Sequence, residues 1–123
     1  ISDGLVASAH DCSDGGFATA LAESCFGVDS GCTVDINSLY VNDVELDGWG
    51  ALFGESLGRI LVSIASKDCE AFETAMAGHA YQQIGEVGKG KQLTINNGDE
   101  TQLSASITTL RKGWKATLDG GAP

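Results

Sequence analysis

The segment His10-Asp11-Cys12-Ser13-Asp14-Gly15-Gly16 runs directly into Phe17-Ala18-Thr19-Ala20-Leu21-Ala22-Glu23-Ser24-Cys25-Phe26. In the second half, the residues at the spacing of one helix face are small or apolar: Phe17, Ala20, Leu21, Ser24 and Cys25. We therefore predict a helix over 17–26. Ser13 or Asp14 is a suitable side chain to cap its start, and Gly27 is a suitable residue to end it.

Strand-like and helix-like patterns alternate through the rest of the chain. The run at 59–65 is rich in β-branched residues and apolar on both faces, so we predict a central strand there. The other expected elements are strands at 32–36, 81–87 and 92–96, a short strand or helix end at 4–12, and helices at 47–53, from a Ser66 cap to His79, and at 103–118. This order predicts an α/β sandwich, with helices packed on a mixed sheet in a loosely ferredoxin-like arrangement.

Length and charge limit the possible functions. The 123 residues suffice for a single domain, which we place at 1–119 with a tail at 120–123. The net charge of −10 argues against a general nucleic-acid binder and against docking on anionic membranes. No apolar run approaches the ~20 residues of a membrane helix. The start, Ile1-Ser2-Asp3-Gly4, has neither an initiator Met nor the pattern of a signal peptide, so we expect a piece of a longer chain.

The cysteines do not form a metal-binding pattern. Cys12, Cys25, Cys32 and Cys69 include no CxxC pair, and the two histidines make no zinc spacing with them. We expect buried free thiols in a reducing cytosol, and a disulfide pair stays open. The acidic run over 35–47 lacks the Gly and Glu of a calcium loop, so we interpret it as a solvated face.

Two glycines at the start of the predicted helix form the first candidate site. Gly15 and Gly16 leave backbone N–H groups unshielded at the positive end of the helix dipole, where phosphate or another anion binds. His10 could donate a hydrogen bond or a proton. Asp11 and Asp14 could accept from a hydroxyl or an amine, or help to hold Mg²⁺. The alternative is a plain capped turn, and the carboxylates would repel a phosphate unless a metal or another cation lies near.

A second polar group lies just before the predicted central strand, in Leu52-Phe53-Gly54-Glu55-Ser56-Leu57-Gly58-Arg59. Glu55, Ser56 and Arg59 lie on a loop that a rigid strand would hold in place. Arg59 suits bidentate recognition of a carboxylate or a phosphate. The alternative is a Glu–Arg surface pair worth less than ~1 kcal/mol. The turn at 88–91 lacks the spacing of a phosphate loop, and we predict that it closes a hairpin.

Together these two stretches resemble a known enzyme family. Residues 10–23 resemble the HDxSDGGLAxALAE segment of phosphoribosylformylglycinamidine synthase, and residues 52–63 resemble its LFGESQGRxxVS segment. Residues 84–87 are similar to the IGxV strand that follows a helix in the same family. The resemblance covers roughly 1–118. The sequence departs from the family at Leu57, where Gln is usual, so the hydrogen bond of that amide is not expected here.

The resemblance implies a C-terminal domain of the synthetase component, related to aminoimidazole ribonucleotide synthase, with an α/β sandwich of partial ferredoxin-like topology. It implies an ATP-dependent ligase of purine biosynthesis that converts formylglycinamide ribonucleotide to its amidine, using Mg²⁺ and ammonia from glutamine. The implied partners are the remaining synthetase domains, a glutaminase domain or subunit and the ribonucleotide substrate, in the cytoplasm. Neither a nucleic acid nor a membrane is among them.

The resemblance also implies which residues contact substrate or nucleotide phosphate: His10, Asp11, Ser13, Asp14, Gly15, Gly16, Glu55, Ser56 and Arg59. No catalytic residue and no metal ligand is assigned, because most contacts with ATP and Mg²⁺ are expected from other domains. The chain alone is therefore expected to be inactive. Two alternatives stay open. One is another ATP-dependent enzyme of the same superfamily, against which the stretch at 53–56 argues, and the other is a non-catalytic interaction domain.

Overall fold

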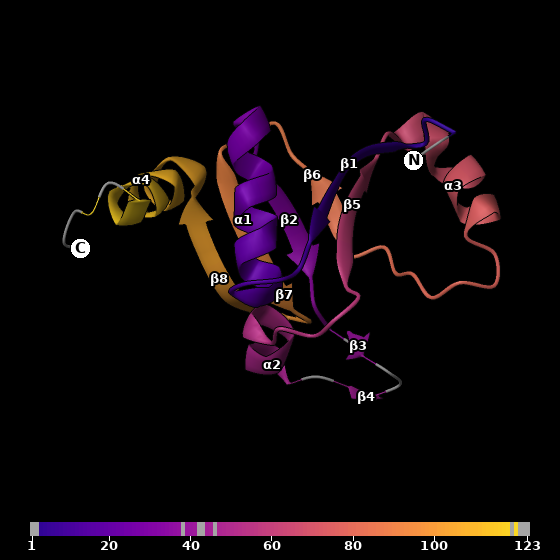
Figure 1. The fold of residues 1–123 in the computed structure, drawn as a ribbon, viewed down its shortest axis with the longest axis horizontal. Coiled ribbons are helices and arrows are strands. Elements are labelled where there is room, and N and C mark those ends of the chain that lie inside the picture. The colour runs from indigo at the N-terminus through magenta and orange to yellow at the C-terminus, as the bar shows by residue number, and fades with distance from the viewer. Residues whose placement is uncertain (1–2, 38, 42–43, 46, 119, 121–123) are drawn as a thin grey trace.

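The centre of the molecule is a four-stranded mixed sheet with a helix lying across it (Figure 1). The computed structural model describes residues 3–37, 39–41, 44, 45, 47–118 and 120. The strand order is β6-β2-β7-β8, made of β6 (Gly85–Val87), β2 (Cys32–Asp35), β7 (Gln92–Asn97) and β8 (Glu100–Ser106). β2 and β7 run parallel, and the other two pairs are antiparallel. The predicted mixed sheet with helices packed on it is confirmed.

The core forms between this sheet and the helix α1 (Gly16–Val28). Along β2, buried and exposed residues alternate, as a strand with one covered face requires. The buried side chains of β7 are Leu93 and Ile95, which are 1% and 0% exposed. The helix predicted over 17–26 is present, and the buried residues on its predicted face are Phe17, Ala20, Leu21 and Cys25. It runs one residue past Gly27, and Asp29 follows in the left-handed conformation.

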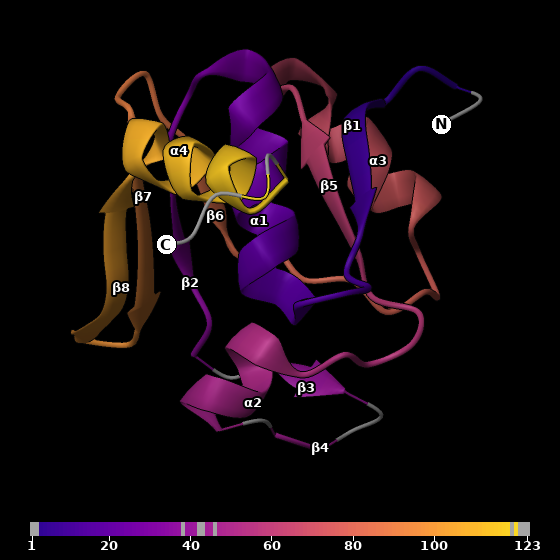
Figure 2. The same cartoon turned by 60° about the vertical axis from the view of Figure 1, so that its left-hand side comes forward.

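A separate two-stranded sheet lies beside α1, on the side where α3 (Cys69–Ala75) is found (Figures 1 and 2). It pairs β1 (Val6–Asp11) with β5 (Ile60–Ile64) in antiparallel register. The strand predicted at 59–65 is present as β5, but its predicted central position is wrong, because β5 pairs only with β1 among the described residues. Ile60 is 65% exposed and Val62 is 37% exposed. Ile60 and Val62 therefore lie at the surface, while Leu61 packs against the core.

The bounds of the last strand and helix differ from those predicted. The helix predicted at 103–118 begins only at Ile107, as α4 (Ile107–Leu118), because residues 100–106 pair with β7. Leu103 is therefore a strand residue. The strand predicted at 81–87 is limited to β6, which pairs with β2 and not with β7. The segment 88–91 thus joins strands on opposite sides of β2, and the predicted hairpin there is wrong.

The helix predicted to start at a Ser66 cap begins instead as a 3₁₀ turn, η1 (Ser66–Asp68), and continues as α3. Ala65 occupies the cap position of η1, and no side chain caps either segment. His79 lies beyond the end of α3. The short helix predicted at 47–53 is present as α2 (Gly48–Phe53), and the Asp47 carboxylate accepts a hydrogen bond from the Gly50 N–H.

The remaining segments complete the chain. Two short strands, β3 (Tyr40–Val41) and β4 (Val44–Glu45), pair with each other. Of the predicted tail, residues 121–123 lie outside the described residues. All four cysteines are free thiols, three of them buried and Cys69 half-buried. Within the described ranges, no helix is both long enough and apolar enough to cross a membrane.

Candidate functional site

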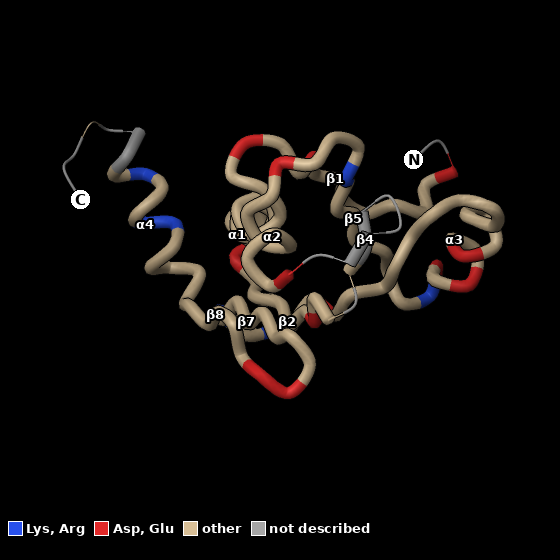
Figure 3. Tube along the Cα trace, turned by 90° about the horizontal axis from the view of Figure 1, so that it is seen from below, with Lys and Arg blue, Asp and Glu red and all other residues tan. Residues whose placement is uncertain are grey.

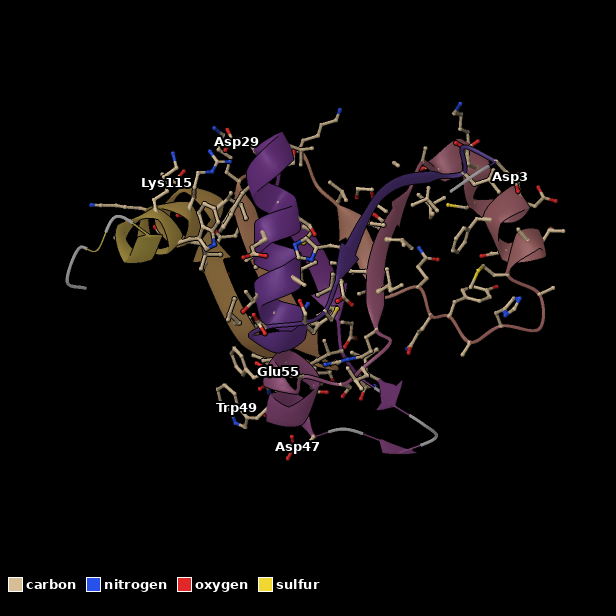
Figure 4. The ribbon with its side chains drawn as sticks, viewed as in Figure 1. Asp3, Asp29, Asp47, Trp49, Glu55 and Lys115 are labelled. Carbon is tan, nitrogen blue, oxygen red and sulfur yellow. The ribbon has the colours of Figure 1, made fainter. Side chains whose placement is uncertain are left out.

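The two stretches singled out in the sequence meet at the N-terminal end of α1. The Gly15 N–H donates a hydrogen bond to Oε1 of Glu55 over 2.9 Å. Gly15 lies in the turn between β1 and α1, and Glu55 lies in the loop between α2 and β5. Figure 4 shows Glu55 at this end of α1, where α2 approaches it. A direct contact therefore joins the two predicted sites into one.

The glycine pair allows α1 and α2 to approach each other closely. Gly16 has a φ of +71°, and a Cβ there would lie 2.7–2.9 Å from backbone atoms of Phe53. Such a contact is too short for any residue with a side chain at this position. Gly15 has a φ of +78°, and its carbonyl accepts a hydrogen bond from Oγ1 of Thr19. The pair thus serves backbone geometry and helix packing.

Both glycine N–H groups are already used within the chain. The Gly15 N–H binds Glu55, and the Gly16 N–H donates to the Ser13 carbonyl over 3.1 Å. The anion at the positive end of α1 is thus a carboxylate of the protein itself. The predicted side-chain cap is wrong: the cap position is held by Gly15, with no side-chain cap bond. Ser13 contributes its carbonyl, and its hydroxyl makes no hydrogen bond to any described residue.

Arg59 connects α2 to the start of β5. Its Nη1 donates to the Ala51 carbonyl over 3.2 Å, and its Nη2 donates to the Gly54 carbonyl. Its own carbonyl accepts from the Cys12 N–H over 3.0 Å. The buried Nε has no hydrogen-bond partner among the described residues. Arg59 and Glu55 therefore do not form the surface pair weighed as an alternative, because each has a backbone partner instead.

His10 contacts the middle of α1. Its Nε2 lies 3.1 Å from Oε2 of Glu23, about two turns into the helix, and its Nδ1 lies 2.8 Å from the Asp11 carbonyl. Both ring nitrogens thus face oxygen atoms of the chain. Glu23 also accepts from Nε1 of Trp114 over 3.1 Å. This chain of contacts joins β1, α1 and α4.

The exposed part of the site is acidic. Asp11, Ser13 and Asp14 are exposed, and Ser56 is half-buried. Among the described residues, the side chains of these four make no hydrogen bond or ion pair. We call Asp11, Ser13, Asp14 and Glu55 the acidic rim. Its three carboxylates favour a cation, an amine or a hydroxyl donor, and they disfavour a bare phosphate.

The acidic rim does not by itself form a metal site. Among the described residues there is no group of three or more His, Cys, Asp and Glu side chains placed to hold a metal ion. Mg²⁺ usually takes one or two protein carboxylates and completes its octahedron with water and phosphate oxygens. The side chains present therefore fit at most a part of such a coordination sphere.

One thiol lies directly behind this site. Cys12 is 4% exposed, and its burial raises the pKa of the thiol, with a smaller opposing effect from the positive charge of Arg59. A thiol with a raised pKa stays protonated near neutral pH and reacts slowly. Cys12 thus acts as a core residue beneath the rim.

A groove between α1 and α4 was not predicted from the sequence. It has a volume of about 520 Å³ and is lined by Glu23, Phe26, Gly27, Arg111, Trp114 and Lys115. The rings of Phe26 and Trp114 lie 5.8 Å apart. Basic residues gather on α4 in Figure 3, and Figure 4 labels Lys115 there. The spacing of Trp114 predicted that it lies on the apolar face of a helix, but only the fold shows that this face lies opposite Phe26 of α1.

Residues 1–96 match the family described as AIR synthase related protein, C-terminal domain. The chain belongs to this family. The matched residues include every element from β1 to β6 and most of β7. Both candidate stretches lie inside it, so the contact between Gly15 and Glu55 is a contact within the AIR synthase related domain.

Two relatives match nearly the whole chain. The phosphoribosylformylglycinamidine synthase subunit PurL of Lactobacillus helveticus (strain DPC 4571) is 36% identical over 118 residues, and that of Lactobacillus acidophilus (strain ATCC 700396 / NCK56 / N2 / NCFM) is 38% identical over 120 residues. Each alignment covers 96% of this chain and 14% of the relative. The chain thus spans about one seventh of the length of these relatives.

Solved structures share the fold. Thermotoga maritima PurL complexed with ATP and the same protein complexed with FGAR each superpose with a TM-score of 0.78 at 19% identity. The superpositions cover 89% of this chain and 19% and 18% of those chains. The predicted fold class, a C-terminal domain of the aminoimidazole ribonucleotide synthase type, is confirmed.

Proposed function

We propose that this chain is a C-terminal domain of a phosphoribosylformylglycinamidine synthase, which converts formylglycinamide ribonucleotide to its amidine with ATP and ammonia. The observation that carries this proposal is the hydrogen bond between Gly15 and Glu55. It joins the two stretches that resemble that synthase at one point of the surface. The two PurL relatives, which align over nearly the whole chain, support the same assignment.

The parent enzyme would use ATP and Mg²⁺ to phosphorylate the amide oxygen of the ribonucleotide, and ammonia would then displace the phosphate. We expect most contacts with ATP and Mg²⁺ to come from domains outside this chain, since the acidic rim offers only part of a metal coordination sphere. A glutaminase domain or subunit would supply the ammonia, and the enzyme would work in the cytoplasm. The solved relatives complexed with ATP, with ADP and with FGAR support these ligand classes for the parent.

Within the domain we assign two groups of residues. The first group holds the start of α1 against α2 and the loop that follows α2. Its members are Gly15, Gly16, Glu55 and Arg59, and each of them makes a close contact that involves a backbone atom. His10 belongs with them, because both of its ring nitrogens face groups of β1 and α1.

The second group is free to contact a ligand: Asp11, Ser13, Asp14 and Ser56. We propose that these side chains bind the substrate or the nucleotide at the boundary with a neighbouring domain. A phosphate approaching three carboxylates needs a compensating cation, so the partner of the rim is a phosphate with its Mg²⁺ or a ribose hydroxyl.

A second role is favoured by the exposed apolar side chains next to the rim. Trp49 and Phe53 of α2 stack at 6.0 Å and are 67% and 47% exposed. Ile60, at the start of β5, is 65% exposed. An apolar patch of this kind is typical of a surface that packs against another protein surface. The domain would then also serve as an interface to the rest of the synthetase.

The proposal is tested by an activity assay of the full-length protein with formylglycinamide ribonucleotide, ATP, Mg²⁺ and ammonia. We expect Ser13→Ala and Asp14→Ala each to lower kcat/KM about tenfold or more, the loss of one charge-assisted hydrogen bond. The control Glu73→Gln, an exposed carboxylate on α3, is expected to stay within about twofold of the unchanged protein. Full activity in both rim variants would favour the interface role alone. Turnover of ATP by the 123-residue chain alone would contradict the proposal.

A further inference from the structure

Two thiols are in contact in the core, at the end of α1 opposite to the acidic rim. The sulfur atoms of Cys25 and Cys32 lie 3.7 Å apart. Cys25 lies in the last turns of α1 and Cys32 is the first residue of β2, and each is 5% exposed. The turn between them includes Asp29, which Figure 4 labels at this end of the helix. The proposed activity of the parent uses neither thiol.

We propose that Cys25 and Cys32 are a covalent modification site, at which a small hydroperoxide converts the two thiols into a disulfide. The sulfur atoms already touch, and a disulfide requires them to approach to about 2.0 Å. The connecting segment is short, so the bond would lock the end of α1 onto the start of β2. This inference is independent of the proposed function.

The hydrogen bond between the thiols makes one of them the nucleophile. The hydrogen bond with Cys32 lowers the pKa of Cys25, although burial opposes this. The same contact, together with burial, raises the pKa of Cys32. The pair therefore loses its first proton at Cys25 and keeps the second on Cys32. A thiolate is the reactive form of cysteine, so oxidation begins at Cys25.

The reaction balances with one peroxide molecule. The Cys25 thiolate attacks one peroxide oxygen, the O–O bond breaks, and the departing hydroxide takes up a proton to become water. The product is a sulfenic acid on Cys25. The Cys32 sulfur then attacks the Cys25 sulfur, the S–O bond breaks, and the departing hydroxide takes the Cys32 proton to become a second water. Two thiols are oxidised to one disulfide, and hydrogen peroxide is reduced to two molecules of water.

The burial of Cys25 and Cys32 limits which oxidants can reach their sulfur atoms. With 5% exposure at each cysteine, a bulky reagent such as an aromatic disulfide does not reach the sulfur atoms in the folded protein, whereas hydrogen peroxide is close to water in size. The other two cysteines are internal controls. Cys12 is buried with no second thiol in contact, and Cys69 is half-buried with its sulfur directed at the Ala65 carbonyl. Neither has a resolving partner.

The experiment treats the native protein with hydrogen peroxide, blocks remaining thiols after denaturation and maps peptides by mass spectrometry. Cleavage before aspartate puts the three nearest cysteines on separate peptides, Asp11–Ser13, Asp14–Val28 and Asp29–Val34. We expect the second and third peptides to be recovered as one linked species lacking two hydrogen atoms. We also expect the oxidised protein to have an unfolding midpoint several degrees higher, about 5 °C, because the link constrains the unfolded chain.

Two further arms make the result decisive. The variant Cys32→Ser is expected to stop at a sulfenic acid on Cys25, which dimedone traps, and Cys69→Ser is expected to form the link as before. The aromatic disulfide reagent is expected to label Cys69 before the pair. The proposal is overturned if peroxide links Cys12 or Cys69 to either member, or if Cys25 and Cys32 stay reduced while Cys69 is oxidised. It is also overturned if the link forms only after denaturation.

Discussion

The Gly15 main-chain N–H donates to the Glu55 carboxylate over 2.9 Å, although 40 positions separate the two residues in the chain. This bond supplies the anion at the positive end of α1 from the loop that follows α2. It fixes the position of the acidic rim relative to the start of β5. The rim is therefore a tertiary feature, since its residues come from the end of β1, the turn after it and the loop after α2, which only the folded chain brings together.

Removing the Glu55 carboxylate should destabilise the domain. In Glu55→Ala the Gly15 N–H and the helix dipole lose their partner, which is expected to lower the free energy of unfolding by about 1 kcal/mol. Glu55→Gln keeps an oxygen acceptor and should lose roughly half as much. Urea unfolding of the three proteins measures this. Equal stability of all three would mean that the bond contributes nothing.

Adding a methyl group at Gly16 should strongly destabilise the domain. Gly16→Ala places a Cβ 2.7–2.9 Å from the Phe53 backbone and forces a side chain into positive φ, so we expect a loss of about 2 kcal/mol or more. Gly27→Ala, on the same helix with nothing within 4 Å, is the matched control and should be neutral or stabilising by up to about 1 kcal/mol. Thermal unfolding of both variants tests this, and similar midpoints would show that α1 and α2 are not closely packed.

Replacing Arg59 should lower the stability of the domain, whether or not this side chain also contacts a ligand. Arg59→Lys cannot reach both the Ala51 and Gly54 carbonyls, and a loss of about 1–2 kcal/mol is expected. A loss of activity in this variant is consequently no evidence for a phosphate contact unless the unfolding midpoint is measured on the same sample. An unchanged midpoint would mean that the two carbonyls do not need the guanidinium.

The acid sensitivity of the domain should depend on Asp29. Its pKa is lowered from 3.8, mainly by the hydrogen bond from Lys91 and also by the charges of Lys91 and Arg111. A lowered folded pKa gives stability that is present above pH 3.8 and is lost as the pH falls through the lower value. Asp29→Asn keeps the left-handed turn, because Asn adopts positive φ readily. Its unfolding midpoint should therefore approach that of the unchanged protein as the pH falls from 6 to 2. A constant difference over that range would exclude this role.

Local patterns predicted the elements that can be recognised from their own residues. The face of α1 and the alternation of β2 depend only on residues within each element, and both were predicted close to their observed bounds. The strand β5 was predicted close to its observed bounds, but its position in a sheet was wrong, because an apolar run fits a central strand and an exposed interface equally well. Leu103 was assigned to a helix because its spacing to Ile107 and Leu110 also fits a helix, and only pairing with β7 decides the matter.

The candidate site was also predicted only in part. Residue types identified both stretches, and the contact between Gly15 and Glu55 brings them together. The individual partners of His10 and Arg59 could not be predicted. Glu23, the partner of His10, lies on another element, and Arg59 binds a backbone carbonyl of α2, which residue types do not indicate. For the same reason, the sequence did not indicate that Trp114 binds Glu23.

The central claim is that the acidic rim contacts the ribonucleotide or ATP in the full-length synthetase. Titration calorimetry of each ligand, with Mg²⁺, into the full-length protein and its Asp14→Asn variant tests it most directly. We predict that the Kd of one of the two ligands rises about tenfold or more while the unfolding midpoint and the Kd of the other ligand stay unchanged. Equal Kd values of both ligands in the two proteins would contradict the account.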